Sequence, residues 1–241
     1  MIIYGLNPVL EAIRSHPERI HYIAVVRERS GKVQRVFEEA KRASVPVRVL
    51  PPDQIERLAS GVVHNGVVAD LSEASYADFD AIVESAKFFM ILDGITDPQN
   101  FGAILRVADG FGVDAVVIPQ HESAGLTAAV VKASAGASQW VRVAQVTNLA
   151  RTIEELKRRE FWIYAAAEGG GAPDSLDLRG KVALVLGSEG KGIRRNVREH
   201  CDAVVTIPMS GKVQSFNVAT AAAVLCWEVR RQQRSPATPR S

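Results

Sequence analysis

The chain has 241 residues, of which 47% are hydrophobic, and its formal net charge is +2. This length predicts one large domain or a small domain followed by a larger one, and the near-neutral charge neither demands nor excludes a nucleic-acid partner. No apolar run reaches the roughly 18 residues of a membrane span, and the first residues lack the pattern of a signal peptide. The two cysteines, Cys201 and Cys226, are typical of buried thiols in a cytoplasmic protein.

The first 72 residues predict a compact αβ unit. Asn7 and Pro8 have the residue types that start a helix. Helices are expected over 8–15, 31–43 and 53–59, and strands over 21–26, 45–50 and 66–71. The polar and acidic segment 72–87 then holds one short helix at most. We therefore expect a first domain over 1–72 and a linker over 73–87.

The second part alternates apolar strands with helical patterns. Strands are expected over 88–93, 114–119, 140–146, 161–167, 182–187 and 203–208, and a last helix over 217–232. Continuous apolar strands separated by helices imply an α/β fold, with a parallel sheet that helices cover on both faces. This predicts a second domain over 88–233, which the resemblance described below makes the catalytic domain, and a disordered tail over 234–241.

A glycine-rich turn, GSEGKG over 187–192, follows one of these apolar strands. It is not a P-loop, because only two residues separate its first glycines and Gly192 takes the place of the Ser or Thr. A second glycine pattern, over 110–115, follows a helix and precedes a strand, which is the reverse of the order in a dinucleotide site. Ligands bind at the carboxyl ends of strands in open α/β sheets, although an ordinary strand-to-helix turn remains an alternative here.

Two further polar clusters follow strand ends. The first holds Asn100 and Arg106 at the start of a helix, and the second holds Ser215 and Asn217 before the last helix. A helix arginine is usually a solvated surface residue, and Ser215 or Asn217 is also a suitable helix cap. The five histidines have no metal-ligand spacing, so no metal is expected. Arg194, Arg195 and Arg198 form a further basic group that is either solvated or in contact with RNA phosphates.

The three polar stretches resemble the three motifs of the SpoU (TrmH-like) branch of the SPOUT RNA 2′-O-ribose methyltransferases. The stretches are TDPQNFGAILRVAD, LVLGSEGKGI and IPMSGKVQSFNVATA. The resemblance implies a trefoil-knotted α/β domain that binds S-adenosylmethionine and a homodimer with its active site at the subunit contact. The opening YGLNPVLEAIRS is similar to the N-terminal domain of the 23S ribosomal RNA guanosine-2′-O-methyltransferases, which implies an L30e-like RNA-binding unit.

The resemblance also assigns roles to residues. The residues implied in catalysis are Asn100, Arg106, Glu189, Ser215 and Asn217, and those implied in cofactor binding are Leu186, Gly187, Ile207, Met209 and Phe216. Two positions depart from the family pattern. Phe216 stands where Leu is more frequent and still offers an apolar wall, while Ala219 replaces a frequent Ser and removes one polar contact.

The implied function is methylation of a ribose 2′-hydroxyl, with a guanosine of 23S ribosomal RNA as the expected target. A methyltransferase acting on a tRNA guanosine or a ribosomal RNA adenosine is the alternative within the class. A noncatalytic RNA-binding protein is the alternative from another class. The presence of all five implied catalytic residues favours an enzyme.

Overall fold

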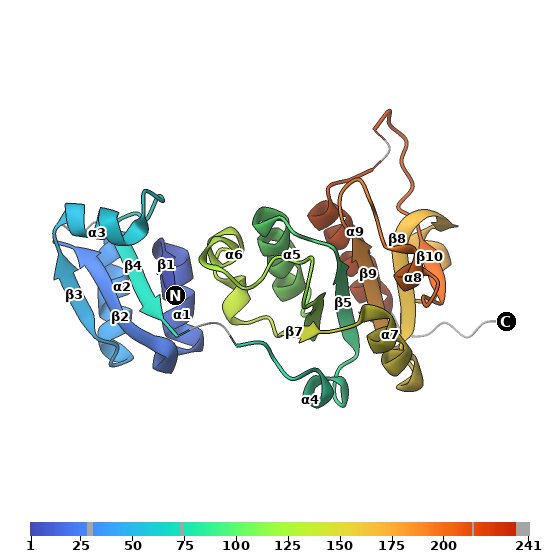
Figure 1. Cartoon of the computed structure of the whole chain (residues 1–241), viewed down its shortest axis with the longest axis horizontal. Coiled ribbons are helices and arrows are strands. Elements are labelled where there is room, and N and C mark those ends of the chain that lie inside the picture. Colours follow the sequence, from blue (N-terminus) through green and yellow to red (C-terminus); the bar gives the residue numbers. More distant parts are fainter. Residues whose placement is uncertain (28–30, 73–74, 214, 235–241) are drawn as a thin grey trace. The chain divides into compact units, whose positions relative to one another are not determined.

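The computed structural model describes residues 1–27, 31–72, 75–213 and 215–234. The chain forms two compact units (Figure 1). The first contains Met1–Ser75 together with Gly125–Trp140, and the second contains Tyr76–Ala124 and the residues from Val141 on. Residues 125–140 lie within the range that the sequence assigns to the catalytic domain, yet they group with the first unit. Residues 235–241 of the expected tail lie outside the described residues.

The first unit is built on a four-stranded mixed sheet. Its strands have the order β1-β4-β2-β3, and β2 and β3 are parallel while the other neighbours are antiparallel. Its elements are β1 (Ile2–Tyr4), α1 (Leu6–Ser15), η1 (Pro17–Arg19), β2 (Ile20–Val26), α2 (Gly31–Arg42), β3 (Val47–Leu50), α3 (Pro52–Ala59) and β4 (Val67–Leu71). The sequence did not indicate β1, because three residues are too few to show alternation. The N-cap of α1 is Gly5 rather than Asn7.

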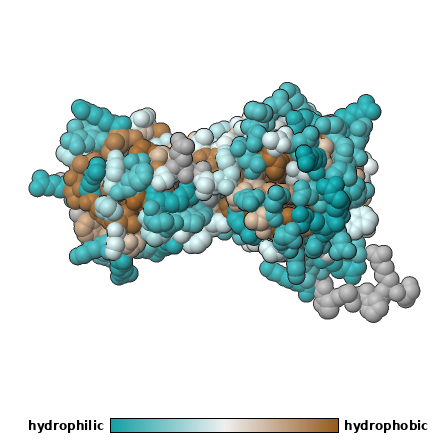
Figure 2. Space-filling view, turned by 60° about the horizontal axis from the view of Figure 1, so that its bottom comes forward, coloured by the Kyte–Doolittle hydropathy of each residue, from teal (hydrophilic) through white to brown (hydrophobic). Residues whose placement is uncertain are grey.

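Helices cover both faces of this sheet because successive strand residues point to opposite sides. Val9 of α1 and Val36 of α2 share a core with Val67, whereas Ile55 of α3 packs with Val68 on the other face. The inserted segment adds α6 (Ala128–Ala133) and η2 (Ala137–Gln139), and its Val131 joins the core of α1 and α2. Hydrophobic residues also reach the surface of this unit among hydrophilic ones (Figure 2). Its exposed large side chains include those of Val49, Val63 and Trp140.

The second unit contains a six-stranded sheet that is parallel throughout. Its strands have the order β10-β8-β9-β5-β6-β7. They are β5 (Phe88–Asp93), β6 (Ala115–Pro119), β7 (Val143–Val146), β8 (Trp162–Gly171), β9 (Val182–Gly187) and β10 (Ala203–Val205). The predicted parallel sheet is confirmed, and its last strand ends at Val205 rather than at Pro208. The central pair β5 and β9 runs in register, so that Asp93 lies beside Gly187 at the carboxyl edge.

Helices cover both faces of the parallel sheet, as predicted. The helical elements are α4 (Phe79–Val83), α5 (Pro98–Gly110), α7 (Leu149–Arg158), η3 (Pro173–Ser175), α8 (Arg195–Arg198) and α9 (Val218–Arg234). Phe89 and Ile91 of β5 share a core with α4, α7 and α8. On the opposite face, the Cys226 thiol of α9 lies 3.7 Å from the sulfur of Met90. The helices α5 and α9 pack against each other (Figure 1), which brings the start of each to the same region.

Candidate active site

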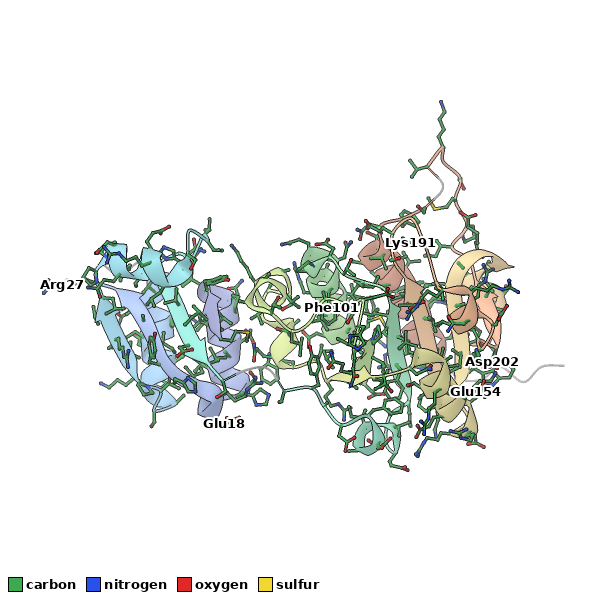
Figure 3. The ribbon with its side chains drawn as sticks, viewed as in Figure 1. Glu18, Arg27, Phe101, Glu154, Lys191 and Asp202 are labelled. Atoms are coloured by element: carbon green, nitrogen blue, oxygen red, sulfur yellow. The ribbon has the colours of Figure 1, made fainter. Side chains whose placement is uncertain are left out.

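The glycine turn after β9 is a closed loop at the carboxyl edge of the sheet. The backbone of Ser188 and that of Gly192 exchange two hydrogen bonds of 3.2 and 2.8 Å, which fold the loop back on itself. A Cβ atom on Gly187 would overlap the backbone of Gly192 and Ile193. Gly187 therefore lets the returning chain pass directly against the end of β9. Lys191 marks this loop in Figure 3.

A cavity of about 730 Å³ opens beside this loop. Its walls come from the end of β8, the glycine loop, the segment after β10 and the start of α9, all in the second unit. The predicted residues that line it are Leu186, Gly187, Glu189, Ile207, Met209, Ser215, Phe216 and Asn217. Its volume lies in the range of small-molecule and cofactor sites. All five residues expected to bind the cofactor thus line one cavity.

Asn217 connects three separate segments at the mouth of this cavity. Its side-chain Nδ2 donates to Asn100 Oδ1 at 2.8 Å and to Glu189 Oε1 at 2.7 Å. Its Oδ1 accepts from the backbone N–H of Ala219 at 2.9 Å, so Asn217 also caps α9. Asn100 is placed by Asp97, which caps α5 and accepts from the backbone N–H groups of Gln99 and Asn100. Asn100, Glu189 and Asn217 are thereby brought together from positions far apart in the sequence.

Arg106 lies apart from this cluster. It is exposed on α5, six residues after Asn100, and does not line the cavity. Six helical residues correspond to about 9 Å along the axis and to a different face of the helix. Within the described parts of the chain, Arg106 forms no hydrogen bond or ion pair. Its guanidinium is therefore available for an anion or for another chain.

Arg194 is engaged within the protein. Its backbone N–H and its guanidinium donate to the carboxylate of Asp93, with three nitrogen–oxygen distances of 2.7 Å. The side chain of Asp93 is 0% exposed, and its ion pair joins Arg194, two residues after the glycine loop, to the end of β5. Arg194 also contacts Glu122 at 3.1 Å. Sequence analysis missed Asp93, although a carboxylate at the last position of an apolar strand is a usable signal.

The neighbouring arginines differ in their surroundings. Arg195 is 92% exposed, and among the described residues it pairs only with Glu199, one helical turn away. Arg198 donates to the backbone carbonyl of Glu168 at 3.1 Å, next to the cavity. Among the three arginines, Arg195 is thus the one best placed for a contact with an external phosphate.

The cysteines offer no nucleophile at this site. Burial raises the pKa of the Cys201 thiol and that of the Cys226 thiol to about 12. Both thiols therefore stay protonated at neutral pH, and neither lines the cavity. Within the residues that the structure describes, no three His, Cys, Asp or Glu side chains are grouped so that they could hold a metal ion. In the same part of the chain, no helix is long and apolar enough to cross a membrane.

The fold has close counterparts among solved structures. The crystal structure of the SpoU methyltransferase AviRb from Streptomyces viridochromogenes, in complex with the cofactor AdoMet, superposes with a TM-score of 0.80. It is 23% identical and covers 96% of this chain and 90% of its own. At this identity the similarity establishes the fold, which is that of a SPOUT methyltransferase with an additional N-terminal mixed-sheet unit.

Sequence comparisons identify the family. Residues 87–227 match the SpoU rRNA Methylase family, and residues 2–77 match the family described as RNA 2′-O ribose methyltransferase substrate binding. The chain is 40% identical to the 23S rRNA (guanosine-2′-O-)-methyltransferase RlmB of Bordetella pertussis, over 97% of this chain and 98% of that protein. It is 39% identical to RlmB of Pectobacterium atrosepticum, over 96% and 98%. The chain belongs to the SpoU rRNA methylase family.

Proposed function

We propose that this protein transfers a methyl group from S-adenosylmethionine to the ribose 2′-hydroxyl of a guanosine in 23S ribosomal RNA. The observation that carries the proposal is the cavity that the second and third SpoU motifs line, with Asn217 of the third motif hydrogen-bonded to Glu189 of the second and to Asn100 of the first. The choice of a 23S guanosine is supported by the RlmB relatives, which match nearly the whole chain.

The cavity suits S-adenosylmethionine in size and in chemistry. Gly187 lets the glycine loop close beside the cavity, and Leu186, Ile207 and Phe216 provide apolar surface for an adenine ring. The backbone beside Ile207 and Met209 offers polar groups to the adenine edge. The bound cofactor supplies an electrophilic methyl on a sulfonium. When the methyl moves to the ribose oxygen, its bond to sulfur breaks and the sulfur becomes a neutral thioether. The products are a 2′-O-methylated ribose, S-adenosylhomocysteine and one proton from the hydroxyl.

The residues of the chain supply position and charge. Holding the two reactants in line is worth up to about 7–11 kcal/mol in favourable cases. Asn100 and Asn217 orient the ribose or Arg106, Glu189 holds Asn217 in place, and Ser215 hydrogen-bonds the substrate. Arg106 is not a simple base, because a guanidinium stays protonated. Arg106 instead binds a phosphate next to the target ribose and lowers the pKa of its hydroxyl, with that phosphate as the proton acceptor.

A homodimer completes this site. Arg106 does not line the cavity of its own chain, so we assign the catalytic guanidinium to Arg106 of the partner subunit. An exposed apolar surface supports this assembly: Val224 is 38% exposed and Trp227 is 56% exposed, three residues apart on one face of α9. The helix α9 packs beside α5, which carries Arg106. Pairing through this surface would bring Arg106 of one subunit toward the cavity of the other.

The remaining features of the proposal follow from the family. The chain from β9 to α9 forms the trefoil knot. Asn217, which donates hydrogen bonds to Asn100 and Glu189, lies within this knotted region. Residues 1–72 form the RNA-binding domain, 73–87 the linker and 88–233 the catalytic domain. Since its substrate is ribosomal RNA, the protein acts in the cytoplasm.

Incubation with tritiated S-adenosylmethionine and separated RNAs tests the proposal. Label is expected in 23S ribosomal RNA, at a ribose of guanosine after nuclease digestion. Label in tRNA or at an adenosine would support the alternatives within the class. Absence of label from every RNA, together with retained RNA binding, would indicate a noncatalytic RNA-binding protein.

The role of Arg106 is tested with Arg106→Ala. The variant should lose at least 1000-fold in kcat, because its contribution is limited to the transition state, while calorimetry shows an unchanged Kd for S-adenosylmethionine. Arg158→Ala, which also removes one exposed guanidinium of the second unit, is the matched control and should retain kcat. Near-normal turnover of Arg106→Ala would remove Arg106 from the mechanism.

A further inference from the structure

The first unit contains a second cavity, of about 480 Å³, that the catalytic site does not use. It is lined by the end of β1, the starts of α1 and α2, the loop before β4, and α6. All of these elements belong to the first unit. Three cationic side chains line it, from Lys32, Arg35 and Lys132, and no carboxylate of the described residues does.

The cations are available to a ligand. Lys32 and Lys132 are exposed, and neither forms a hydrogen bond or an ion pair within the described residues. Arg35 uses its Nε to contact Glu39 at 3.1 Å, which leaves its terminal nitrogens free of that contact. Within the part of the chain that the structure describes, no carboxylate lines the cavity to balance these charges, so the cavity favours an anion.

The inserted segment holds Lys132 at this cavity. Trp140 Nε1 donates to Glu11 Oε2 of α1 at 3.0 Å. Gly136 has φ of 98°, and a Cβ there would lie 2.6 Å from Cγ of Glu11. The turn after α6 is thus seated closely on α1. Lys132 Nζ lies 6.0 Å from the ring centre of Tyr4, which also lines the cavity.

The cavity also offers surface to an aromatic base. Tyr4 provides a ring, and Val63, which is 69% exposed, provides an uncovered apolar side chain. The carboxamide of Asn7 adds two donors and one acceptor for a base edge. Unpaired RNA bases are recognised in this way, by stacking on aromatic side chains while basic groups bind the phosphates.

We propose that this cavity binds an unpaired nucleotide of the substrate RNA, with the base against Tyr4 and Val63 and the flanking phosphates on Lys32 and Lys132. The inference rests on the proposed function and adds a second RNA contact to it. Lys132 lies outside residues 2–77, which match the substrate-binding family. The proposed nucleotide site therefore combines residues of the substrate-binding family region with Lys132 of the inserted segment 125–140.

The direct test is binding of fluorescein-labelled decauridylate to the full chain, measured by anisotropy. The double variant Lys32→Glu, Lys132→Glu should raise the Kd by more than about tenfold, since hydrogen bonds to charged groups are lost. The slope of log K against log salt should fall by about 1.4, because roughly 0.7 is lost for each phosphate contact to a single strand. The control is Lys41→Glu, compared with the single variant Lys32→Glu, because both lysines lie on α2 and Lys41 does not line the cavity. Lys41→Glu should change the Kd less than twofold.

Methylation kinetics separate this inference from the proposed function. With 23S ribosomal RNA, the double variant should show a raised KM for RNA and unchanged kcat and KM for S-adenosylmethionine. If the wild type methylates 23S ribosomal RNA and the double variant has the same kinetics and the same Kd for decauridylate, the nucleotide site is overturned and the proposed function stands. No methylation by the wild type, with decauridylate binding that depends on the two lysines, would overturn the proposed function and keep the site. Displacement of decauridylate by adenosine monophosphate with equal affinity would overturn the assignment to an RNA strand.

Discussion

At the scale of single residues, the site depends on a few side chains that connect distant segments. Asn217 joins the start of α9 to the glycine loop and to the start of α5, although Asn100 precedes it by 117 positions. Asp93 similarly joins the end of β5 to Arg194. These contacts hold the glycine loop at the edge of the cavity, so their loss should affect cofactor binding before it affects the overall fold.

The absence of a side chain at Gly187 should be essential. In Gly187→Ala the new methyl would overlap the backbone of Gly192 and Ile193, and the hydrogen bonds between Ser188 and Gly192 oppose its release. We expect at least a 100-fold loss of affinity for S-adenosylmethionine, measured by calorimetry. Gly180→Ala is the control, because a Cβ at Gly180 meets nothing within 4 Å. Equal affinity in both variants would show that the loop has another arrangement.

The buried carboxylate of Asp93 should position the glycine loop. Asp93→Asn keeps the shape of the side chain but removes the charge that binds Arg194, so the KM for S-adenosylmethionine should rise about tenfold with a smaller change in kcat. Glu122→Gln removes only the exposed partner of Arg194 and should change the KM less than twofold. If the two variants had the same KM, the ion pair with Asp93 would have no role in cofactor binding.

At the scale of elements, α9 is held at both ends. Asn217 caps its start, and side chains of its last turns hydrogen-bond to the rest of the second unit. Gln232 Nε2 donates to the carbonyls of Pro173 and Leu176 and to Glu228 Oε1. Arg231 donates to both carboxylate oxygens of Glu228 at 2.7 Å. The orientation of α9, and with it the position of Asn217, therefore depends in part on Glu228.

The Glu228 carboxylate makes this anchoring sensitive to acid. Its hydrogen bonds from Arg231 lower its pKa below the usual 4.5. A carboxylate with a lowered pKa in the folded state contributes stability that is fully present above pH 4.5 and is lost as the pH falls through the lowered value. The difference in unfolding free energy between wild type and Glu228→Gln, from urea titrations, should be constant from pH 7 to 5 and shrink below 4.5. A difference that stays constant down to pH 3 would contradict this.

At the scale of the whole molecule, the proposed enzyme needs two chains. A mixture of Arg106→Ala and Gly187→Ala chains tests this without disturbing the interface. In a mixed dimer, the cavity of the Arg106→Ala chain faces an intact Arg106 of the partner subunit, so one of the two sites is complete. After random subunit exchange, about a quarter of wild-type activity should appear from two inactive proteins. Continued inactivity of verified mixed dimers would place both residues of each site in one chain.

Much of the second unit was predictable from the sequence. Six apolar runs separated by helical patterns indicated a parallel sheet with two covered faces, because burial on both sides removes the alternation of polar residues. Three polar clusters at strand ends indicated a single site, since parallel strands present their carboxyl ends at one edge. Leu186, Gly187, Ile207, Met209 and Phe216 do line one cavity.

The sequence by itself determined the class of sheet, the positions of the motifs and the family, because side-chain periodicity and short motifs are local properties of the chain. Only the tertiary structure decided the strand order, the grouping of residues 125–140 with the first unit, and the ion pair of Asp93 with Arg194. It also left Arg106 and Asn100 outside the lining of the cavity that the other eight predicted residues share, with Asn100 joined to it through Asn217. These outcomes depend on which surfaces pack together across a hundred residues or more, and no local pattern in the sequence carries that information.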